Sequence, residues 1–593
     1  MNTILKIVIG LLVTALVSIY LGSLAVWYWA NLYGNPPYNA PIILWQQGSA
    51  QHRAWLINGS LMVFAVLTIL AALIFGKWYL KQRSMVYGRS KLAGFFDVKK
   101  AGLFNKQQGI FLGYFNNRPL FDSTQQHVSL IAESGTGKGV SLIIPNLFLW
   151  SGSVIVSDMK GENFALTSGY RAARGQSCYC FDPFSNTTHR INPLSYLDER
   201  NPIDHLQRIS YVIYPDPEGK EALWSSGSRQ LFMGLALLLL LEQGKAAVTF
   251  INILSVQGTL DLEKVDARIH KLSGNRFLID SCWQLLREYA DTPDKTRGGI
   301  KAEFRSKLDI FLNPPVAWAT SGNDVPLDQL RKSPITLYLS TSPSNIARVS
   351  FLMRVILETV NMLHTQEEFK ANPEHRYELL LLNDEQHNFY GNLPLMLKAA
   401  SFYRSYGIRI FSVYQSVAQI KIDYGDNGAR AYLDNHNIRI HYCPTDQRKA
   451  REFATEIGET TIFTKSRSTG GQGRASVSEA PQKREAFLPE ELIKMLGQKY
   501  GLLFVGGSRP IRFRKAIWYK EKTFRERQLP PVALPTADQR TMESFLGKYM
   551  PSFSEHQMTA DPVAALCDMV SSGASEENIN ELIDKMIIKG HRA

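Results

Sequence analysis

The chain has 593 residues, too long for one compact domain, and about 100–200 residues per domain suggests several units. Hydrophobic residues make up 45% and charged residues 20%, which excludes a mostly disordered chain. The net charge of +13 permits contact with nucleic acid without requiring it. Five cysteines, an odd number, exclude a disulfide scaffold, and Cys178 and Cys180 have no second pair at metal-ligand spacing.

The charge is distributed unevenly along the chain. Residues 1–100 carry a net charge of +8, residues 101–550 carry +9 and residues 551–593 carry −4. The acidic end has helical spacing and predicts either a packed C-terminal hairpin or an acidic docking surface for a partner or substrate.

Two long uncharged runs lie near the amino terminus. Ile7 to Ala30 spans 24 residues and Ala54 to Gly76 spans 23. A helix of either length, rising about 1.5 Å per residue, is long enough to cross a bilayer. The alternatives are a cleaved signal peptide for the first run and a buried core helix for the second, but both runs are longer than those alternatives require. We expect two transmembrane helices.

The basic residues that flank these runs predict the orientation. A cluster of Lys and Arg follows the second run with no acid before Asp97, whereas the loop between the runs carries only Arg53. The positive-inside rule then places both ends of the chain in the cytoplasm and the short Pro-rich loop outside. The basic cluster consists of Lys77, Lys81, Arg83, Arg89 and Lys91.

The body of the chain alternates short apolar runs with helical patterns. Short apolar runs with little polar alternation are typical of strands buried on both faces, so we expect a mainly parallel sheet covered by helices. The strand candidates are His127–Ile131, Ser153–Asp158, Ser177–Phe181, Ile335–Ser340, Glu378–Leu382, Ile408–Val413, Ile438–Tyr442 and Gly501–Val505.

Two stretches depart from this alternation. Residues 201–330 contain several helical patterns and few strand candidates, which predicts an all-helical insertion. Its apolar run Leu231 to Leu241 is too short to span a membrane and predicts a buried helix. Thr464–Arg484 is rich in Gly and Ser and predicts a flexible loop.

A phosphate-binding loop is predicted at residues 132–138, Ala-Glu-Ser-Gly-Thr-Gly-Lys, which follow an apolar strand and open a helix. Backbone N–H groups of such a loop surround phosphates, and Lys138 reaches the terminal ones. Ala132 replaces the first glycine, and Gly139 stands where a Ser or Thr would hold Mg²⁺. The candidates for that Mg²⁺ ligand are then Ser141 and a water molecule.

A second group of polar residues follows two other apolar strands. Asp384 and Glu385 end one of them, where Asp384 can hold hydrated Mg²⁺ and Glu385 can polarise the attacking water. Gln415 follows the next strand and can sense the γ-phosphate, or is a plain turn residue. Arg404 and Arg409 flank that strand, and in a ring either could reach a neighbour's nucleotide, or is a solvated surface residue.

Together these motifs resemble the VirD4/TraG family of type IV secretion coupling proteins. The likeness covers roughly residues 85–520, although Ser90 and Gln386 depart from the family pattern. The matching segments are Tyr87–Ala93, Ser134–Val140, Asp158–Glu162 with Thr167 and Arg171, Leu382–Glu385, Tyr414–Ser416 and Tyr424–Gly425.

The resemblance implies an α/β fold, with a RecA-like P-loop nucleotide-binding domain that carries an inserted all-α domain and is preceded by two transmembrane helices. The expected divisions are a two-helix anchor at 1–76, a juxtamembrane segment at 77–125, the two parts of the nucleotide-binding domain at 126–200 and 331–525, the all-α domain at 201–330 and an acidic helical tail at 526–593.

The resemblance also implies the site residues and the cofactors, ATP and Mg²⁺. Asp384 is the expected Mg²⁺ ligand, Glu385 the catalytic carboxylate, Gln415 the sensor and Arg404 the arginine finger, with Arg409 as second candidate. The expected nucleotide-binding loop consists of Ser134, Gly135, Thr136, Gly137, Lys138, Gly139 and Val140.

The implied function is that of an inner-membrane coupling ATPase. It would recruit relaxase–DNA complexes or effector proteins, contact DNA with little sequence preference, meet other type IV secretion components and form a homo-hexamer. Two other hypotheses are a chromosome-partitioning DNA pump of the FtsK type and a non-enzymatic membrane adaptor. The pump would have a long Pro/Gln-rich linker and a winged-helix terminus, which are not visible. The adaptor is suggested by Ala132 and Gln386.

Overall fold

The structure is a computed structural model of the chain. It describes residues 3–29, 36, 38–83, 91–104, 109–216, 222–444, 446–457, 459–469, 475–485 and 487–549. The chain forms two compact units, Met1–Lys91 with Arg451–Leu488, and Leu92–Ala450 with Pro489–Ala593. Tyr87–Ser90 of the juxtamembrane motif and the predicted helices of the tail beyond Tyr549 lie outside the described residues.

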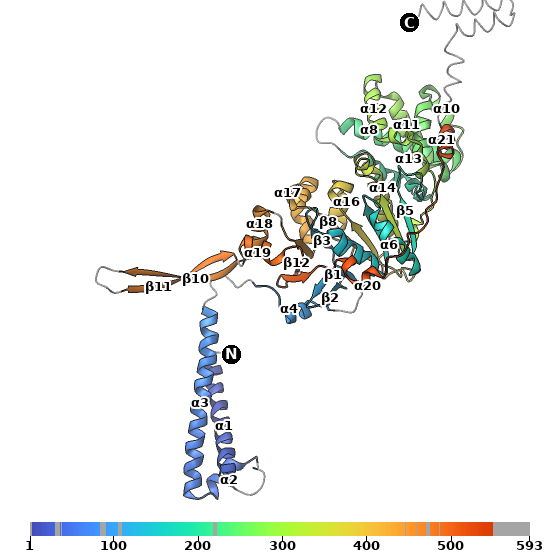
Figure 1. Ribbon diagram of the computed structural model, residues 1–593. Helices are drawn as coiled ribbons and strands as arrows, with labels where there is room; N and C mark the ends of the chain where they lie inside the picture. Colours follow the sequence, from blue (N-terminus) through green and yellow to red (C-terminus); the bar gives the residue numbers. More distant parts are fainter. Residues whose placement is uncertain are drawn as a thin grey trace, which may run out of the picture. The chain divides into compact units, whose positions relative to one another are not determined.

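The first unit contains a pair of long helices, α1 (Thr3–Trp29) and α3 (Ala50–Arg83), joined through the short α2 (Ala40–Gln46) (Figure 1). Val26, Leu44 and Leu56 form a small buried cluster where the three helices meet. Gly22 of α1 lies against Ser60 of α3 so closely that a Cβ at position 22 would collide with Ser60, so a small residue lets the two backbones approach.

The outward faces of these helices are apolar. Leu16, Met62 and Ile74 expose 68%, 72% and 68% of their surface. Among the described residues, one helix, Ala50–Ile74, has the length and hydropathy needed to cross a membrane, and Val13–Tyr28 is a shorter apolar segment.

Residues 459–485 contain a two-stranded antiparallel ribbon, β10 (Glu459–Thr469) with β11 (Ala475–Glu485), paired from Glu459↔Glu485 to Thr469↔Ala475. The prediction of a flexible loop over Thr464–Arg484 is therefore wrong for both strands. Gly and Ser dominated that prediction, whereas β10 begins before the predicted loop, on β-branched and aromatic residues (Thr460, Thr461, Ile462, Phe463) that favour a strand.

The second unit is built on one mixed sheet with the strand order β2-β1-β13-β12-β9-β3-β8-β7-β4-β6-β5. Its part from β9 to β5 is parallel, and β2, β1, β13 and β12 extend it as antiparallel strands. The strands are β1 (Ile110–Phe115), β2 (Arg118–Asp122), β3 (Val128–Ile131), β4 (Ser153–Asp158), β5 (Ser177–Phe181), β6 (Ile335–Ser340), β7 (Leu379–Asn383), β8 (Ile408–Tyr414), β9 (Ile438–Tyr442), β12 (Tyr500–Val505) and β13 (Ile511–Arg514).

All eight predicted strands are present, with ends within one residue of the prediction, and the mainly parallel sheet is confirmed. The sequence analysis missed β1, β2 and β13. β2 starts on Arg118-Pro119 and β13 alternates buried with more exposed residues, so neither has the continuous apolar run of a doubly buried strand.

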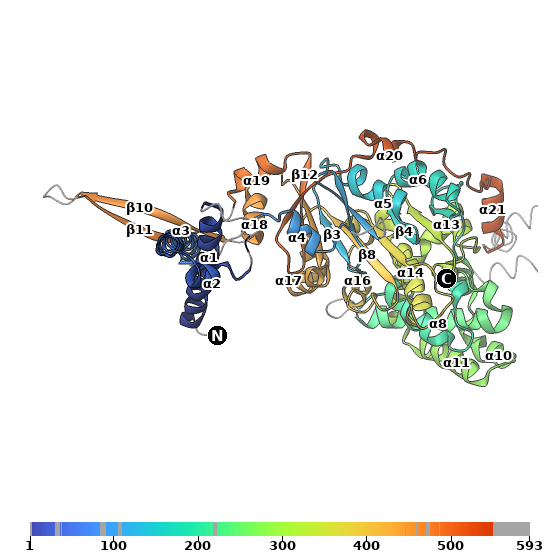
Figure 2. The same cartoon turned by 90° about the horizontal axis from the view of Figure 1, so that it is seen from below.

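Helices cover both faces of this sheet. Leu379 and Leu381 of β7 belong to one buried cluster and Leu380 and Leu382 to another, as the alternation of side chains along a strand requires. Figure 2 shows α5 (Ile144–Leu149) and α6 (Glu162–Ala173) on one side of the strands. The helices on the other side are α14 (Ile346–His364), α16 (Pro394–Ala399) and α17 (Val417–Asn435).

Helices joined by turns and irregular segments make up most of the described chain between β5 and β6, and no strand of the main sheet lies among these described residues. The predicted buried run lies in α8, where Leu231 and Leu235 to Leu239 are fully buried. The helices there are α7 (Pro202–Ile213), α8 (Ala222–Gln243), α9 (Phe250–Thr259), α10 (Val265–Ile269), α11 (Arg276–Asp291), α12 (Asp294–Leu308) and α13 (Pro314–Ala319). The remaining helices are α4 (Phe95–Lys100), α15 (Gln386–Tyr390), α18 (Gln447–Ile457), α19 (Pro489–Leu496), α20 (Lys522–Arg525) and α21 (Gln539–Gly547).

Candidate nucleotide-binding site

The sheet brings three distant segments to one edge. β3, β8 and β7 are parallel neighbours, so their carboxyl ends lie side by side. The backbone N–H of Ala132, just after β3, donates to the carbonyl of Tyr414 at the end of β8, over 2.9 Å. The predicted phosphate loop therefore starts beside Gln415 and one strand away from Asp384 and Glu385.

Two glycines shape the loop between β3 and the next helix. Gly135 has φ of +78° and Gly137 has φ of +85°, conformations that residues with a Cβ adopt only under strain. The helix that follows opens with a wide turn, Gly139–Ile143, and continues as α5. Pro145 cannot donate the backbone hydrogen bond that an α-helix needs at its position, and the helix is widened just before it.

Lys138 meets Glu385 across this edge. The Lys138 Nζ lies 2.7 Å from Glu385 Oε1, and 13% and 26% of the two side chains are exposed. Glu385 has φ of +53° and caps α15, which turns its side chain toward the loop. Burial alone would raise the pKa of Glu385, but the hydrogen bond and charge of Lys138 lower it below its ordinary value.

Asp384 lies in a different environment from its neighbour. Asp384 is half-buried, but its Oδ1 atom is buried and accepts no hydrogen bond from any described residue. Burial, with Glu385 and Asp158 nearby, raises the pKa of Asp384 to about 6, although Lys138 acts in the opposite direction. An orphaned buried carboxylate oxygen beside a phosphate loop fits a ligand for Mg²⁺, which prefers oxygen donors and keeps several waters.

The sequence left Ser141 and a water molecule as candidates to replace the hydroxyl that the loop lacks at Gly139. The Ser141 hydroxyl lies 2.6 Å from the Gly137 carbonyl oxygen and 2.6 Å from the Tyr442 hydroxyl, and Ser141 is fully buried. Ser141 is thus committed to holding the loop. A Cβ at Gly139 would meet nothing within 4 Å, so there is open space at the position of the missing hydroxyl.

Gln415 follows β8 directly, and its backbone N–H donates to Gln419 Oε1 over 2.8 Å. Behind it a buried hydrogen-bond network joins β8 to α15 and α17. The Tyr432 hydroxyl donates to Ser412 Oγ over 2.6 Å and lies 3.0 Å from Gln386 Oε1, and Gln386 Nε2 donates to the Tyr424 hydroxyl over 3.2 Å. The unusual Gln386 is therefore fully buried and hydrogen-bonded through its side-chain amide.

The two candidate arginines have opposite environments. Arg404 is exposed and precedes β8, at the sheet edge opposite the phosphate loop, where it donates to Gln126 Oε1 over 2.8 Å. Arg409 is only 1% exposed and forms a buried ion pair with Asp122. A buried arginine cannot reach the nucleotide of another subunit, so the prediction of Arg409 as the second candidate arginine finger is wrong. Arg409 instead has a structural role and joins β8 to β2.

Sequence reasoning missed two lysines that support the loop. Lys515, buried just after β13, donates to the Thr136 carbonyl over 3.0 Å and lies 3.8 Å from the centre of the Tyr442 ring. Lys449 pairs with Glu133 at 2.8 Å. Both lie more than 300 residues from the loop in sequence, and only the strand order could have indicated their approach.

The comparisons with known proteins agree with this architecture. A family model described as type IV secretory system conjugative DNA transfer matches residues 81–541, which is most of the chain. The chain belongs to this family. It is 24% identical over 509 residues to the conjugal transfer protein TraG of Escherichia coli, covering 76% of this chain and 79% of the relative. It is 26% identical over 459 residues to the VirD4 protein of Agrobacterium fabrum, covering 74% of this chain and 67% of the relative.

Solved structures show the same fold. The bacterial conjugative coupling protein TrwB, lacking its first 70 residues and crystallised with sulphate, superposes with a TM-score of 0.55 at 14% identity, over 73% of this chain and 94% of that chain. TrwB bound to the ATP analogue ADPNP gives a TM-score of 0.53 at 13% identity, covering 73% and 96%. The family membership expected from the motifs is confirmed, and the α/β fold of the second unit is that of a conjugative coupling protein.

Proposed function

We propose that this chain is a membrane-anchored ATPase that couples ATP hydrolysis to the transfer of DNA through a type IV secretion system. One observation carries the proposal: Lys138 from the loop after β3 meets Glu385 after β7 at 2.7 Å, beside Asp384, whose Oδ1 accepts no hydrogen bond from any described residue. TrwB, which shares the fold, has been crystallised with an ATP analogue and with ADP and Mg²⁺, which supports nucleotide binding by this chain.

Each residue has a distinct role in the proposed reaction. The phosphate loop, Ser134 to Val140, binds the triphosphate through its backbone N–H groups and through Lys138. The γ-phosphate competes with Glu385 for the Lys138 ammonium, because both are anions that need the same cation. Glu385, released from its ion pair, then accepts a proton from the attacking water.

Asp384 and Gln415 complete the site in this proposal. Asp384 and water molecules hold Mg²⁺, which neutralises charge on the phosphate oxygens when bound. Asp384 is presented by the end of β7 and backed by Ser157, whose hydroxyl donates to the Asp384 carbonyl over 2.7 Å. Gln415, one strand away, senses the γ-phosphate position.

Arg404 belongs to a neighbouring site in this proposal. It lies at the sheet edge opposite its own phosphate loop, so its guanidinium is accessible to another copy of the chain. A homo-hexameric ring would place Arg404 of one subunit at the nucleotide of the next, where it stabilises charge on the transferred phosphate.

The anchor and the partners follow from the family and from the first unit. The apolar outer faces of α1 and α3 support two spans of the bacterial inner membrane, with both termini cytoplasmic. The division into anchor, nucleotide-binding domain, all-α domain and tail is proposed as given above. The cargo is a relaxase–DNA complex or an effector protein, and the other type IV secretion components are the membrane partners.

The test is ATP hydrolysis by the purified full chain in lipid nanodiscs, with and without single-stranded DNA. Wild type should hydrolyse ATP, whereas Lys138→Ala and Glu385→Gln should lose at least 100-fold in turnover, the usual size of a missing phosphate contact or catalytic base. Glu385→Gln should still bind a labelled ATP analogue. Equal turnover by all three proteins would reject the proposal and favour a non-enzymatic adaptor.

A further inference from the structure

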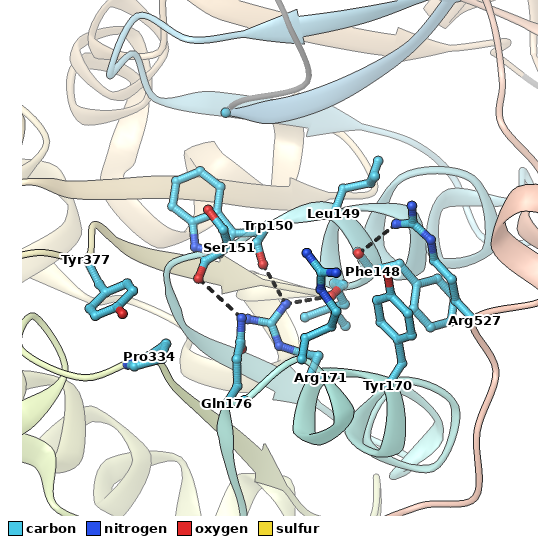
Figure 3. A pocket seen from close by; sticks show the side chains of 14 residues that line it. Phe148, Leu149, Trp150, Ser151, Tyr170, Arg171, Gln176, Pro334, Tyr377 and Arg527 are labelled. Atoms are coloured by element: carbon cyan, nitrogen blue, oxygen red, sulfur yellow. Dashed lines mark hydrogen bonds between the residues drawn. The ribbon is translucent and has the colours of Figure 1, made fainter.

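A cavity lies at the other edge of the sheet, away from the phosphate loop. It is a cavity of about 490 Å³, within the size range of small-ligand sites. Its walls are the segments that enter strands: residues 147–151 before β4, residues 170–176 before β5, Pro334 before β6 and Tyr377 before β7, with Arg527 after α20 (Figure 3). We call it the arginine pocket.

The lining of the arginine pocket is basic. Arg171, Arg174 and Arg527 line it, and none of the lining residues is an Asp or a Glu. The ends of α5 and α6 also lie here, but their carbonyl dipoles amount to only about half a negative charge each. Three guanidinium groups outweigh them, so the pocket has a net attraction for anions.

Arg171 brings an uncompensated charge into the protein interior. It is 2% exposed, and its described partners are all neutral: the Thr336 hydroxyl at 2.6 Å and the carbonyls of Leu147, Trp150 and Gly152 at 2.5, 3.0 and 3.1 Å. Burial lowers the pKa of Arg171, but a guanidinium stays charged in proteins. A fixed buried cation with no carboxylate beside it adds to the positive potential of the adjoining cavity.

The other two arginines are placed to contact a ligand. Arg527 donates one N–H to the Phe148 carbonyl over 2.9 Å and lies over the Tyr170 ring at 5.2 Å, which holds its guanidinium at the wall (Figure 3). Arg174 is exposed at the end of α6. Neither arginine has an ion pair with any of the residues that the structure describes, so both retain guanidinium N–H donors for a ligand.

We propose that the arginine pocket binds a phosphate group of a single-stranded nucleic acid. Planar guanidinium forks match phosphate oxygens, and rigid placement lowers the entropic cost of binding. The partly exposed ring of Tyr377 offers a flat surface for an adjacent base. The choice of nucleic acid over another phosphate source rests on the proposed function, whereas the anion site itself does not.

The experiment measures binding of a short fluorescein-labelled oligothymidylate to the full chain in nanodiscs, without nucleotide, over a range of salt concentrations. Arg174→Gln and Arg527→Gln should each weaken binding by about tenfold and reduce the slope of log affinity against log salt by about 0.7, the loss of one phosphate contact on a single strand. Arg525→Gln is the matched control, because Arg525 lies on the same helix end, is exposed and does not line the pocket.

Two further measurements locate the site of oligonucleotide binding. They are competition by inorganic phosphate and hydrogen exchange at residues 147–152 and 170–177. The proposal is supported if phosphate competes with the oligonucleotide in wild type but not in Arg174→Gln, and if the oligonucleotide protects those two segments from exchange. Unchanged oligonucleotide affinity in both variants, or a loss confined to free phosphate, overturns it. Because no ATP is present, failed ATP hydrolysis would not alter the result, and failed oligonucleotide binding would leave the ATPase proposal intact.

Discussion

Asp384 and Glu385 are adjacent carboxyl groups with opposite pKa shifts. Burial raises the pKa of Asp384 to about 6, and Lys138 lowers that of Glu385. In the folded chain without metal, the protonated form of Asp384 is favoured, so its contribution to stability is present below its unfolded pKa of 3.8 and is lost as pH rises through about 6. In the proposed site, Mg²⁺ would take the place of this proton.

We therefore predict that Mg²⁺-dependent nucleotide binding weakens as pH falls below about 6, by up to tenfold per pH unit, because the proton competes for the Asp384 carboxylate. Titration calorimetry between pH 5 and 8 measures the effect. Asp384→Asn has no titrating carboxylate at this position, so it should bind Mg²⁺ and nucleotide weakly and without this pH dependence. Asp158→Asn is the control, since burial also raises the pKa of Asp158 to about 6 but its Oδ2 accepts from the Phe164 N–H. A pH dependence that follows Asp158 would contradict the assignment.

The two glycines that flank Lys138 should respond differently to the same substitution. Gly139→Ser has open space for its side chain and no left-handed φ, so the variant should fold normally and bind Mg²⁺–nucleotide at least as tightly as wild type. Gly137→Ser places a Cβ at φ of +85° and should lose about 1–2 kcal/mol of stability. Thermal unfolding and nucleotide titration distinguish them; equal destabilisation of the two variants would contradict this loop geometry.

At the scale of elements, the buried pair Arg409–Asp122 joins β8 to the antiparallel extension of the sheet. Removing one partner leaves an uncompensated buried charge, so Arg409→Met should destabilise the chain by about 3–5 kcal/mol. Arg404→Met, at an exposed position, should change stability by no more than about 0.5 kcal/mol. Thermal unfolding of the two variants measures the difference. A tolerated Arg409→Met would show that this pair does not hold the sheet together.

The elements that the sequence predicted well are those with one dominant physical signal. β4 and β6 are buried on both faces, and their apolar runs leave little ambiguity. β10 and β11 were missed because their polar residues and the Gly-rich and Ser-rich composition around them resemble those of a loop.

The residues of the candidate site also divide into those that a local pattern predicts and those that only the tertiary fold brings together. Lys138, Asp384 and Glu385 follow strands that could be recognised, so their meeting was predictable. Lys515 and Lys449 approach the loop through the strand order, which no local pattern reveals. The burial of Arg409 depends on its contact with Asp122, which is distant in sequence.

At the scale of the whole molecule, the proposed ring makes each active site a product of two subunits. Lys138→Ala subunits keep Arg404, and Arg404→Ala subunits keep the phosphate loop. Each variant alone should be inactive, with Arg404→Ala losing about 1,000-fold or more in turnover. A mixture should recover activity, because some interfaces then combine an intact loop with an intact arginine. Full activity of Arg404→Ala alone would contradict the role of Arg404 as the shared residue.

The most direct measurement is a cryo-microscopy structure of the full chain with Mg²⁺ and a non-hydrolysable ATP analogue. The account predicts that the Lys138 Nζ leaves Glu385 for an oxygen of the γ-phosphate, and that Asp384 faces the Mg²⁺. A nucleotide bound elsewhere, or a Lys138–Glu385 pair still closed at 2.7 Å beside an empty loop, would contradict it.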